Sequence, residues 1–163
     1  QSNIIYQDAF TLENSDLVFA NDSIYFSNNK NELFSIDART GTINWKQTVN
    51  SSLIPIIIEN LLITISNEGY LFTIQKNLGN IIRINDIYKI YDKKKKSKVK
   101  PIGFTVADNN LFLTSNDGKI MMIELMTGNI VKFQKISKNV ISKPFIHNEN
   151  LFVIKNGSII LKL

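Results

Sequence analysis

Short apolar segments, separated by polar turns, follow one another along the whole chain. The best-formed unit is residues 36–45, where an extended segment ends at Asp37 and a polar turn carries Thr40 and Gly41. A new segment of alternating residues then runs into Trp45. Gly41 suits a turn position of positive φ, which is accessible at little steric cost to a residue without Cβ.

The same turn returns twice along the sequence. It is clear at Thr127 and Gly128 and more divergent at Gly79, and each time a fresh apolar segment follows it. A second type of turn lies ten residues before each of the three glycines, and a fourth copy falls near the end of the sequence. The anchors of this second turn are Asn31, Gly69, Gly118 and Gly157. The period of about 40 residues is typical of β-propeller blades.

Each repeat predicts four short strands, which we name A to D in chain order. Strands B and C form a hairpin across the second turn, and strand D follows the Gly41-type turn. Strands B and C are apolar at successive positions, as in 62–65 and 71–74, which indicates a sheet buried on both faces between two others. No segment keeps a 3.6-residue period over a helical length. We therefore predict an all-β chain, a single β-propeller or propeller fragment over residues 1–163 with about four four-stranded blades.

The two ends of the sequence indicate how such a ring would close. Residues 3–7 have the pattern of a strand D, and residues 158–162 form a strand C with no strand D after it. Because folded proteins avoid unpaired apolar edges, we expect these two segments to pair. Two alternatives remain open: one chain closes a four-bladed ring, or the chain is half of an eight-bladed ring. The ends of a half-ring would be covered by further sequence or by a second copy in a homodimer.

The net charge of +5 is concentrated in one insertion between blades. Residues 86–100 contain seven Lys and two Asp, so this segment carries all of the excess charge. We predict a solvated, mobile loop on the face that also carries the B–C turns. Alternatively, the insertion contacts anionic lipid head groups or an acidic partner, or its two Tyr anchor it on the ring. The side chains proposed for partner contact are Tyr88, Tyr91, Lys93, Lys94, Lys95, Lys96, Lys98 and Lys100.

Residues 36–45 resemble the repeat of PQQ-like (quinoprotein-type) β-propellers, in which an A-x-D-x-x-T-G-x-x-x-W pattern locks neighbouring blades. The Trp of that pattern is present as Trp45, and the equivalent residues in the other repeats are Tyr6, Arg83 and Lys132. The C-terminal run 144–160 is similar to the closing blade of the BamB-type lipoproteins of outer-membrane β-barrel assembly. This resemblance implies a non-enzymatic, periplasmic scaffold, anchored to the outer membrane as a lipoprotein. It would make the chain the C-terminal half of an eight-bladed ring.

Candidate catalytic chemistry is sparse in this sequence. There is no Cys, so no thiolate nucleophile or Cys-ligated metal is available, and the cofactor-covering disulfide implied by a quinoprotein dehydrogenase is absent. His147 is the single His, so a His-based triad or a zinc site lacks parts. Asp37, Asp108 and Asp117 fall at turns or strand ends, where carboxylates accept hydrogen bonds from the local backbone. We expect no catalytic, cofactor-binding or metal site.

The sequence therefore favours a non-enzymatic propeller scaffold that binds a protein partner, and the resemblance implies an outer-membrane assembly component as that partner. No nucleic-acid partner is expected, because the basic charge is not spread over one face. The alternatives are a fragment of a PQQ-dependent dehydrogenase and the sensor domain of a signalling protein. The residues expected to shape the repeat turns are Asp37, Thr40, Gly41, Trp45, Gly69, Gly79, Gly118, Thr127, Gly128 and Gly157.

Overall fold

The computed structural model describes residues 15–28 and 30–162, and these residues form four antiparallel sheets in chain order. We call the sheets blades 1 to 4. Blade 1 comprises β1 (Val18–Ala20), β2 (Ser23–Ser27), β3 (Glu32–Asp37) and β4 (Ile43–Thr48). Blade 2 comprises β5 (Ile56–Ile58), β6 (Leu61–Ile65), β7 (Tyr70–Gln75) and β8 (Ile81–Asp86). Blade 3 comprises β9 (Pro101–Ala107), β10 (Asn110–Ser115), β11 (Lys119–Glu124) and β12 (Ile130–Lys135), and blade 4 has β13 (Phe145–His147), β14 (Asn150–Lys155) and β15 (Ile159–Lys162).

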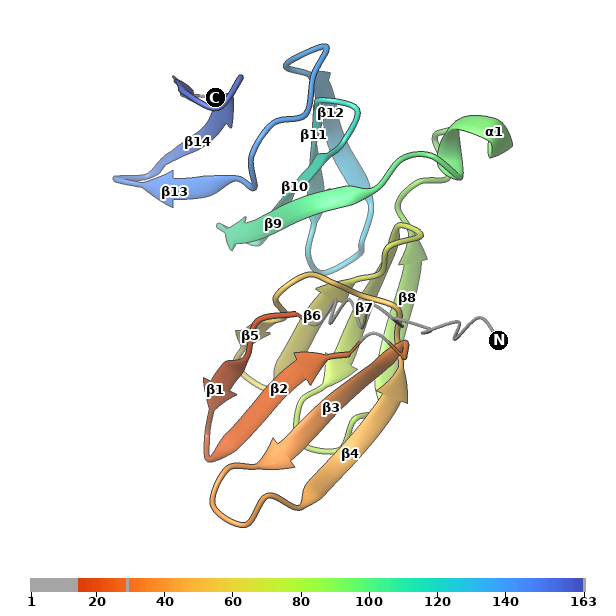
Figure 1. Cartoon of the computed structure of the whole chain (residues 1–163), viewed down its shortest axis with the longest axis vertical. Coiled ribbons are helices and arrows are strands. Elements are labelled where there is room, and N and C mark those ends of the chain that lie inside the picture. Colours follow the sequence, from red (N-terminus) through yellow and green to blue (C-terminus); the bar gives the residue numbers. More distant parts are fainter. Residues whose placement is uncertain (1–14, 29, 163) are drawn as a thin grey trace, which may run out of the picture.

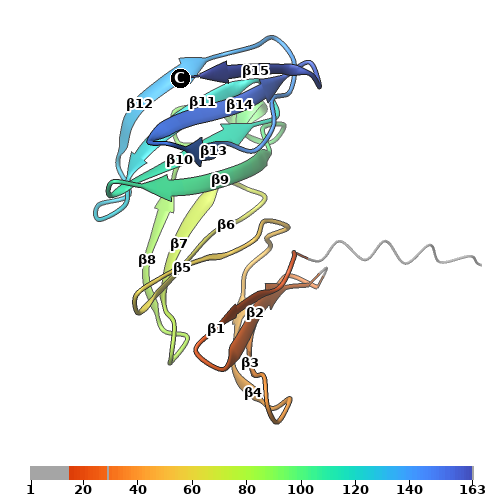
Figure 2. The same cartoon turned by 90° about the vertical axis from the view of Figure 1, so that its left-hand side faces the viewer.

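The blades follow one another along a curved row, so that blades 1 and 4 lie at its two ends (Figures 1 and 2). Within each blade every strand pairs with the next strand in the chain. The first strands of blades 3 and 4, β9 and β13, contact each other. This arrangement of consecutive up-and-down sheets confirms the predicted all-β propeller fold with four-stranded blades.

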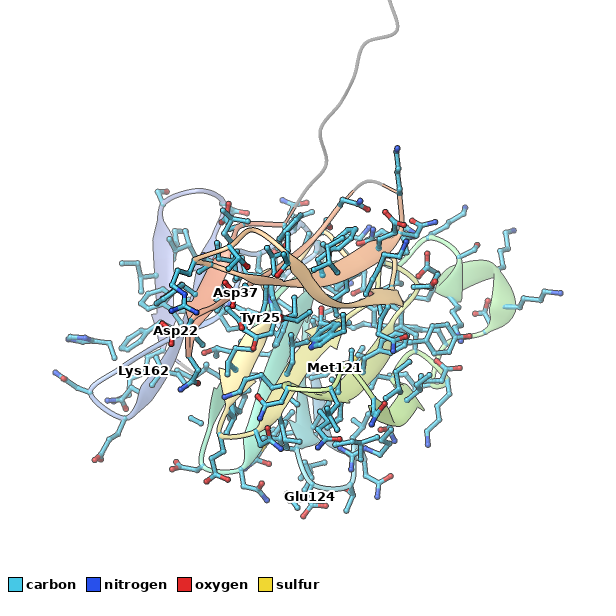
Figure 3. All side chains as sticks on the ribbon, turned by 90° about the horizontal axis from the view of Figure 1, so that it is seen from below. Asp22, Tyr25, Asp37, Met121, Glu124 and Lys162 are labelled. Carbon is cyan, nitrogen blue, oxygen red and sulfur yellow. The ribbon has the colours of Figure 1, made fainter. Side chains whose placement is uncertain are left out.

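The hydrophobic core lies in the junctions between blades. Along β6, Leu62 belongs to the core cluster shared with blade 1, whereas the next residue, Ile63, belongs to the cluster shared with blade 3. Both side chains are fully buried. Successive residues of a strand point to opposite faces, so this sheet is covered on both sides, as its unbroken apolar sequence predicts. Viewed from below, Tyr25 and Met121 lie toward the centre of the molecule and Glu124 and Lys162 at its edge (Figure 3).

The A–B turns of blades 1, 3 and 4 are two-residue hairpin turns in which both residues have positive φ. The pairs are Asn21 with Asp22, Asp108 with Asn109, and Asn148 with Glu149. Asn and Asp tolerate this left-handed conformation better than most residues, and it matches the twist of the flanking strands. The B–C turn of blade 1 similarly has Asn31 at a φ of 62° where the other blades have Gly.

Two predictions from the sequence concern residues 3–7 and the Lys-rich insertion. Residues 3–7, predicted as a first strand D, lie outside the described residues. The Lys-rich insertion was predicted as a loop, but it contains the one-turn helix α1 (Lys93–Lys96), which lies within the connection between β8 and β9 (Figure 1). No helix among the described residues is long and apolar enough to cross a membrane.

Candidate partner-binding surface and the junctions that support it

The turn between strands C and D has the same backbone hydrogen bond in the first three blades. The amide of the turn Gly donates to the carbonyl of the residue four positions earlier, at 2.8–2.9 Å, in the pairs Gly41–Asp37, Gly79–Gln75 and Gly128–Glu124. In blade 1 the Asp37 carboxylate also accepts from the amide and the hydroxyl of Thr40, at 2.7 and 3.0 Å. These bonds hold the pKa of Asp37 below its ordinary value. In blade 3 the Thr127 hydroxyl donates to Glu124 in the same way.

Blade 1 is locked to blade 2 through Trp45. Its indole N–H donates to the carbonyl of Lys76 at 2.7 Å, and Gln47, two residues further along β4, donates to the carbonyl of Gly79 at the same distance. The indole covers Gly79 so closely that a Cβ on that glycine would lie 2.7 Å from Cγ and Cδ2 of Trp45. The side chains of Trp45 and Gln47 therefore hydrogen-bond the main chain of blade 2, and the indole belongs to the apolar core that includes Leu62, Phe72 and Ile74 of that blade.

Blade 2 is locked to blade 3 by a different residue in the equivalent position. The Arg83 guanidinium donates to the carbonyl of Leu125 at 2.6 Å and also to that of Met126. Asn85, two residues along β8, donates to the carbonyl of Thr127 at 3.2 Å and occupies the space beside Gly128. Arg83 therefore bonds blade 2 to blade 3, as Trp45 bonds blade 1 to blade 2. The sequence pattern did not predict this role.

The insertion between β8 and β9 is anchored by buried side chains. Ile87, Tyr88 and Val99 are at most 2% exposed and Tyr91 is 9% exposed, and all four belong to the core between blades 2 and 3. The ring of Tyr88 lies directly on Gly69, where a Cβ would approach its Cδ2 to 2.0 Å. Their burial raises the pKa of both Tyr hydroxyls. It also corrects the prediction that Tyr88 and Tyr91 touch a partner, because neither ring is available to one.

A charged cluster around Asp117 fastens the insertion to the B–C turn of blade 3. The Asp117 carboxylate accepts from the Ser115 hydroxyl at 2.7 Å and from the Tyr91 hydroxyl at 3.3 Å. It also pairs with Lys119 at 3.1 Å and with Lys95 at 3.6 Å. Burial raises the pKa of Asp117, but the bonds from Ser115 and Lys119 outweigh it and leave this pKa below its ordinary value. The carboxylate is therefore a structural centre of the insertion.

The backbone of the insertion is also held in place. The Asp92 carboxylate caps α1 by accepting from the amide of Lys95 at 2.9 Å. Asn116, in the B–C turn of blade 3, holds the C-terminal end of the insertion. Its side chain accepts from the amide of Lys100 and donates to the carbonyl of Lys98, at 2.9 and 3.0 Å. Gly118 closes the same turn against the backbone that follows β12. The insertion is therefore ordered by specific contacts and is not the mobile loop predicted from its composition.

The charged ends of most insertion lysines project from this fixed base. Lys96 pairs with Asp86 at 2.5 Å, a contact that raises the pKa of Lys96, and Lys95 pairs with Asp117. Within the described part of the chain, no carboxylate pairs with the other insertion lysines, which are exposed: Lys89, Lys93, Lys94, Lys98 and Lys100. We call these five residues the lysine surface.

The remaining residues singled out from the sequence do not converge on a reaction centre. His147 ends β13 and is exposed, and Gly157 lies in an open turn of blade 4. Within residues 15–28 and 30–162, no three His, Cys, Asp or Glu side chains are grouped so that they could hold a metal ion. The Asp117 cluster contains one carboxylate, two lysines and a tyrosine, and its parts are used in holding the insertion.

The chain resembles known propellers in sequence and in structure. A family model described as outer membrane protein assembly factor BamB matches residues 6–85, just under half of the chain. The structure of BamB from Moraxella catarrhalis superposes with a TM-score of 0.67 at 18% identity, over 87% of this chain and 42% of that one. The fold and the repeats define a β-propeller protein. Its repeats resemble those of the PQQ-like, BamB-type propellers.

Two further solved structures share the fold. The computationally designed Ika4 protein gives a TM-score of 0.72 at 9% identity, over 96% of this chain and 93% of that one. A europium-containing methanol dehydrogenase gives 0.59 at 14% identity, over 72% of this chain and 23% of that one. No curated protein sequence matches this one. The chain spans about two-fifths of the length of the BamB chain that it matches, and at these identities structural likeness shows the fold alone.

Proposed function

We propose that this chain is a non-enzymatic propeller scaffold that holds a protein partner at the lysine surface. The observation that carries the proposal is the contrast within the insertion. Its base is buried and bonded at Tyr88, Tyr91 and Asp117, while five lysines stay without a carboxylate partner in the described structure. A preorganised charged surface loses little conformational entropy on binding, which favours a docking role.

The family model supports a more specific setting for this scaffold. Its description as an assembly factor leads us to propose a periplasmic location, with anchoring to the outer membrane as a lipoprotein in the full-length protein. The partner is then a component of the outer-membrane β-barrel assembly machinery. Charged groups at such an interface increase the association rate and select the partner.

A direct binding measurement tests this proposal. The purified chain is immobilised through a terminal tag, and the soluble periplasmic part of the outer-membrane β-barrel assembly machinery is passed over it in biolayer interferometry. We expect saturable binding that weakens as salt is raised from about 50 to about 200 mM, since exposed charges are screened in this range. Absence of binding at every salt concentration would count against the assembly role.

The second candidate function is that of a PQQ-dependent dehydrogenase fragment, and the methanol dehydrogenase neighbour is the observation that favours it. The residues of this chain do not fit such a site, because the sequence has no Cys and the one Trp is engaged in the blade junction. Titration of PQQ with Ca²⁺, followed by absorbance, separates the two functions. We expect no stoichiometric binding, and micromolar binding would favour the dehydrogenase.

We also propose that residues 3–7 complete blade 4, in the same chain or in a second copy of it. Blade 4 has three strands among the described residues, whereas blades 1 to 3 have four. Sedimentation of the whole chain and of a form lacking residues 1–8 tests this idea. A soluble form with unchanged stability and mass after the deletion would show that these residues close nothing.

A further inference from the structure

We propose that a concave part of the lysine surface binds an acidic peptide segment carrying two neighbouring carboxylates, an inference that rests on the proposed scaffold function and specifies its partner. The site is a hollow of about 390 Å³ between α1 and the B–C turn of blade 2. Its lining residues are Glu68, Tyr70, Lys93, Lys96, Ser97 and Lys100. Two segments of the chain that are well separated in sequence therefore meet in one recess.

The charges around the hollow are only partly compensated. Lys96 is held by Asp86 and lies over the ring of Tyr70, with its Nζ 5.0 Å from the ring centroid. Lys93 and Lys100 make no ion pair with any described carboxylate, although the Lys100 ammonium donates to the carbonyl of Asn67 at 3.4 Å. Two ammonium groups without a described carboxylate partner therefore line the recess, and they suit a ligand that supplies one carboxylate to each.

The one carboxylate in the lining is already engaged. Glu68 accepts a hydrogen bond of 2.5 Å from the side-chain amide of Asn50. Asn50 also accepts from the side chain of Asn67, and the backbone carbonyl of Asn50 accepts from the Asn67 amide. Glu68 is therefore held by the connection between β4 and β5. It stays exposed, and within the described structure it makes no ion pair with Lys93 or Lys100.

The shape of the site favours a peptide over a membrane surface. A lipid bilayer presents a broad face, which is best met by a protruding basic surface with apolar side chains that enter the interface. Here the lysines surround a recess whose partly exposed aromatic wall, Tyr70, is itself covered by Lys96. A narrow chain with acidic side chains can enter where a flat surface cannot.

The walls of the site keep their positions without a ligand. The Tyr70 end of β7 is paired with Asp86 of β8, and the same Asp86 holds Lys96. On the opposite side Lys100 is fixed through its amide by Asn116. Binding should therefore require little rearrangement of the backbone, and affinity should depend on the two free lysines.

Fluorescence anisotropy of the whole chain with a labelled Gly-Ser-Glu-Asp-Glu-Asp-Ser-Gly peptide tests the inference. The comparison peptide has Gln and Asn in place of Glu and Asp. We expect the double variant Lys93→Glu/Lys100→Glu to weaken binding of the acidic peptide by about tenfold or more, because it replaces both attractive contacts by repulsive ones. The matched control is Lys132→Glu/Lys138→Glu, which makes the same change in net charge at exposed lysines of blade 3 and the connection after it. It should change binding by less than about threefold.

Three results would overturn the inference. Equal weakening by the two double variants would mean attraction to overall charge, and equal binding of the two peptides would mean that carboxylates are not recognised. Binding to vesicles of phosphatidylglycerol and phosphatidylethanolamine, without binding to the acidic peptide, would assign the lysines to a membrane. If the assembly component binds the Lys93→Glu/Lys100→Glu variant as tightly as the native chain, this docking site is wrong while the scaffold function stands.

Discussion

The contact between Trp45 and Gly79 leads to a quantitative prediction with a control inside the same chain. Gly41 and Gly79 both have a φ of +74° at equivalent positions of the C–D turns. A Cβ on Gly79 would lie 2.7 Å from two ring atoms of Trp45, whereas a Cβ on Gly41 meets nothing within 4 Å in the described structure. Gly41→Ala therefore measures the cost of the left-handed backbone alone, and Gly79→Ala adds the collision.

The expected sizes follow from these two terms. A left-handed residue with a Cβ costs about 1–2 kcal/mol, and this cost is common to both variants. Forcing an extra methyl group against a packed ring costs about a further 1–3 kcal/mol. With a urea dependence of about 3 kcal/mol per molar for a chain of this size, Gly79→Ala should unfold about 0.3–1 M earlier than Gly41→Ala.

Urea unfolding followed by circular dichroism is the assay, because Trp45 is the single Trp of the chain and its replacement leaves no Trp fluorescence to follow. The decisive comparison repeats Gly79→Ala in a Trp45→Ala background, where the indole is gone and the additional cost should vanish. Equal midpoints for Gly41→Ala and Gly79→Ala, or an additional cost that survives removal of the indole, would refute the account of the junction.

Three further predictions concern the insertion and the second junction. Tyr91→Phe removes the hydrogen bond to Asp117 and should cost about 1 kcal/mol, whereas Tyr88→Phe removes a buried hydroxyl with no partner in the described structure and should be neutral or stabilising in urea unfolding. Because the folded pKa of Asp117 is lowered, its contribution is present above the ordinary carboxyl pKa and is lost as the pH falls through the folded value. The stability difference between the native chain and Asp117→Asn should therefore be seen at about pH 6 and shrink as the pH falls below the ordinary carboxyl pKa; a constant difference would contradict it. Arg83→Met keeps an unbranched side chain but leaves the carbonyls of Leu125 and Met126 without their donor, and should cost about 1–3 kcal/mol, measured by thermal unfolding against Lys132→Met as control.

The repeat pattern was sufficient to predict the fold because the turns are determined locally. A Gly amide bonding four residues back, or an Asn with positive φ at residue 31, depends on nearby residues alone. The apolar character of β6 on both faces is likewise a property of one short segment, and it correctly indicates burial between two sheets. Periodicity therefore gave the blades, their order and nearly all of their strand positions.

The contacts that build the candidate site depend on residues far apart in the sequence. Asp117 meets Tyr91 and Lys95 only because the fold brings the β8–β9 connection onto the next blade. The burial of Tyr88 likewise follows from its position over Gly69, and composition alone could not distinguish that arrangement from an exposed aromatic. One local signal was available and was not used: Asp92 lies three residues before Lys95, the spacing of a helix N-cap.

Arg83 shows a different limit of sequence reasoning. When the second repeat is compared with the family pattern, Arg83 is noted only because it is not the expected Trp. The structural requirement at this position is for a long side chain that ends in an N–H donor, and both indole and guanidinium meet it. A search for donors would have found Arg83, whereas a search for aromatic rings could not.

The hydrogen bonds of Trp45 and Arg83 across the junctions end on main-chain carbonyls of the next blade, and this has a consequence for how such rings vary. Every residue has a carbonyl, so the accepting position is free to change, and here it is Lys76 in one blade and Leu125 in the next. The accepting half of each hydrogen bond therefore does not depend on the side chain of the residue that bears the carbonyl, whereas the close approach of the indole still requires Gly at residue 79. A duplicated blade would therefore find hydrogen-bond acceptors on its new neighbour, whereas the glycine of the C–D turn and the apolar packing of the junction would still have to match.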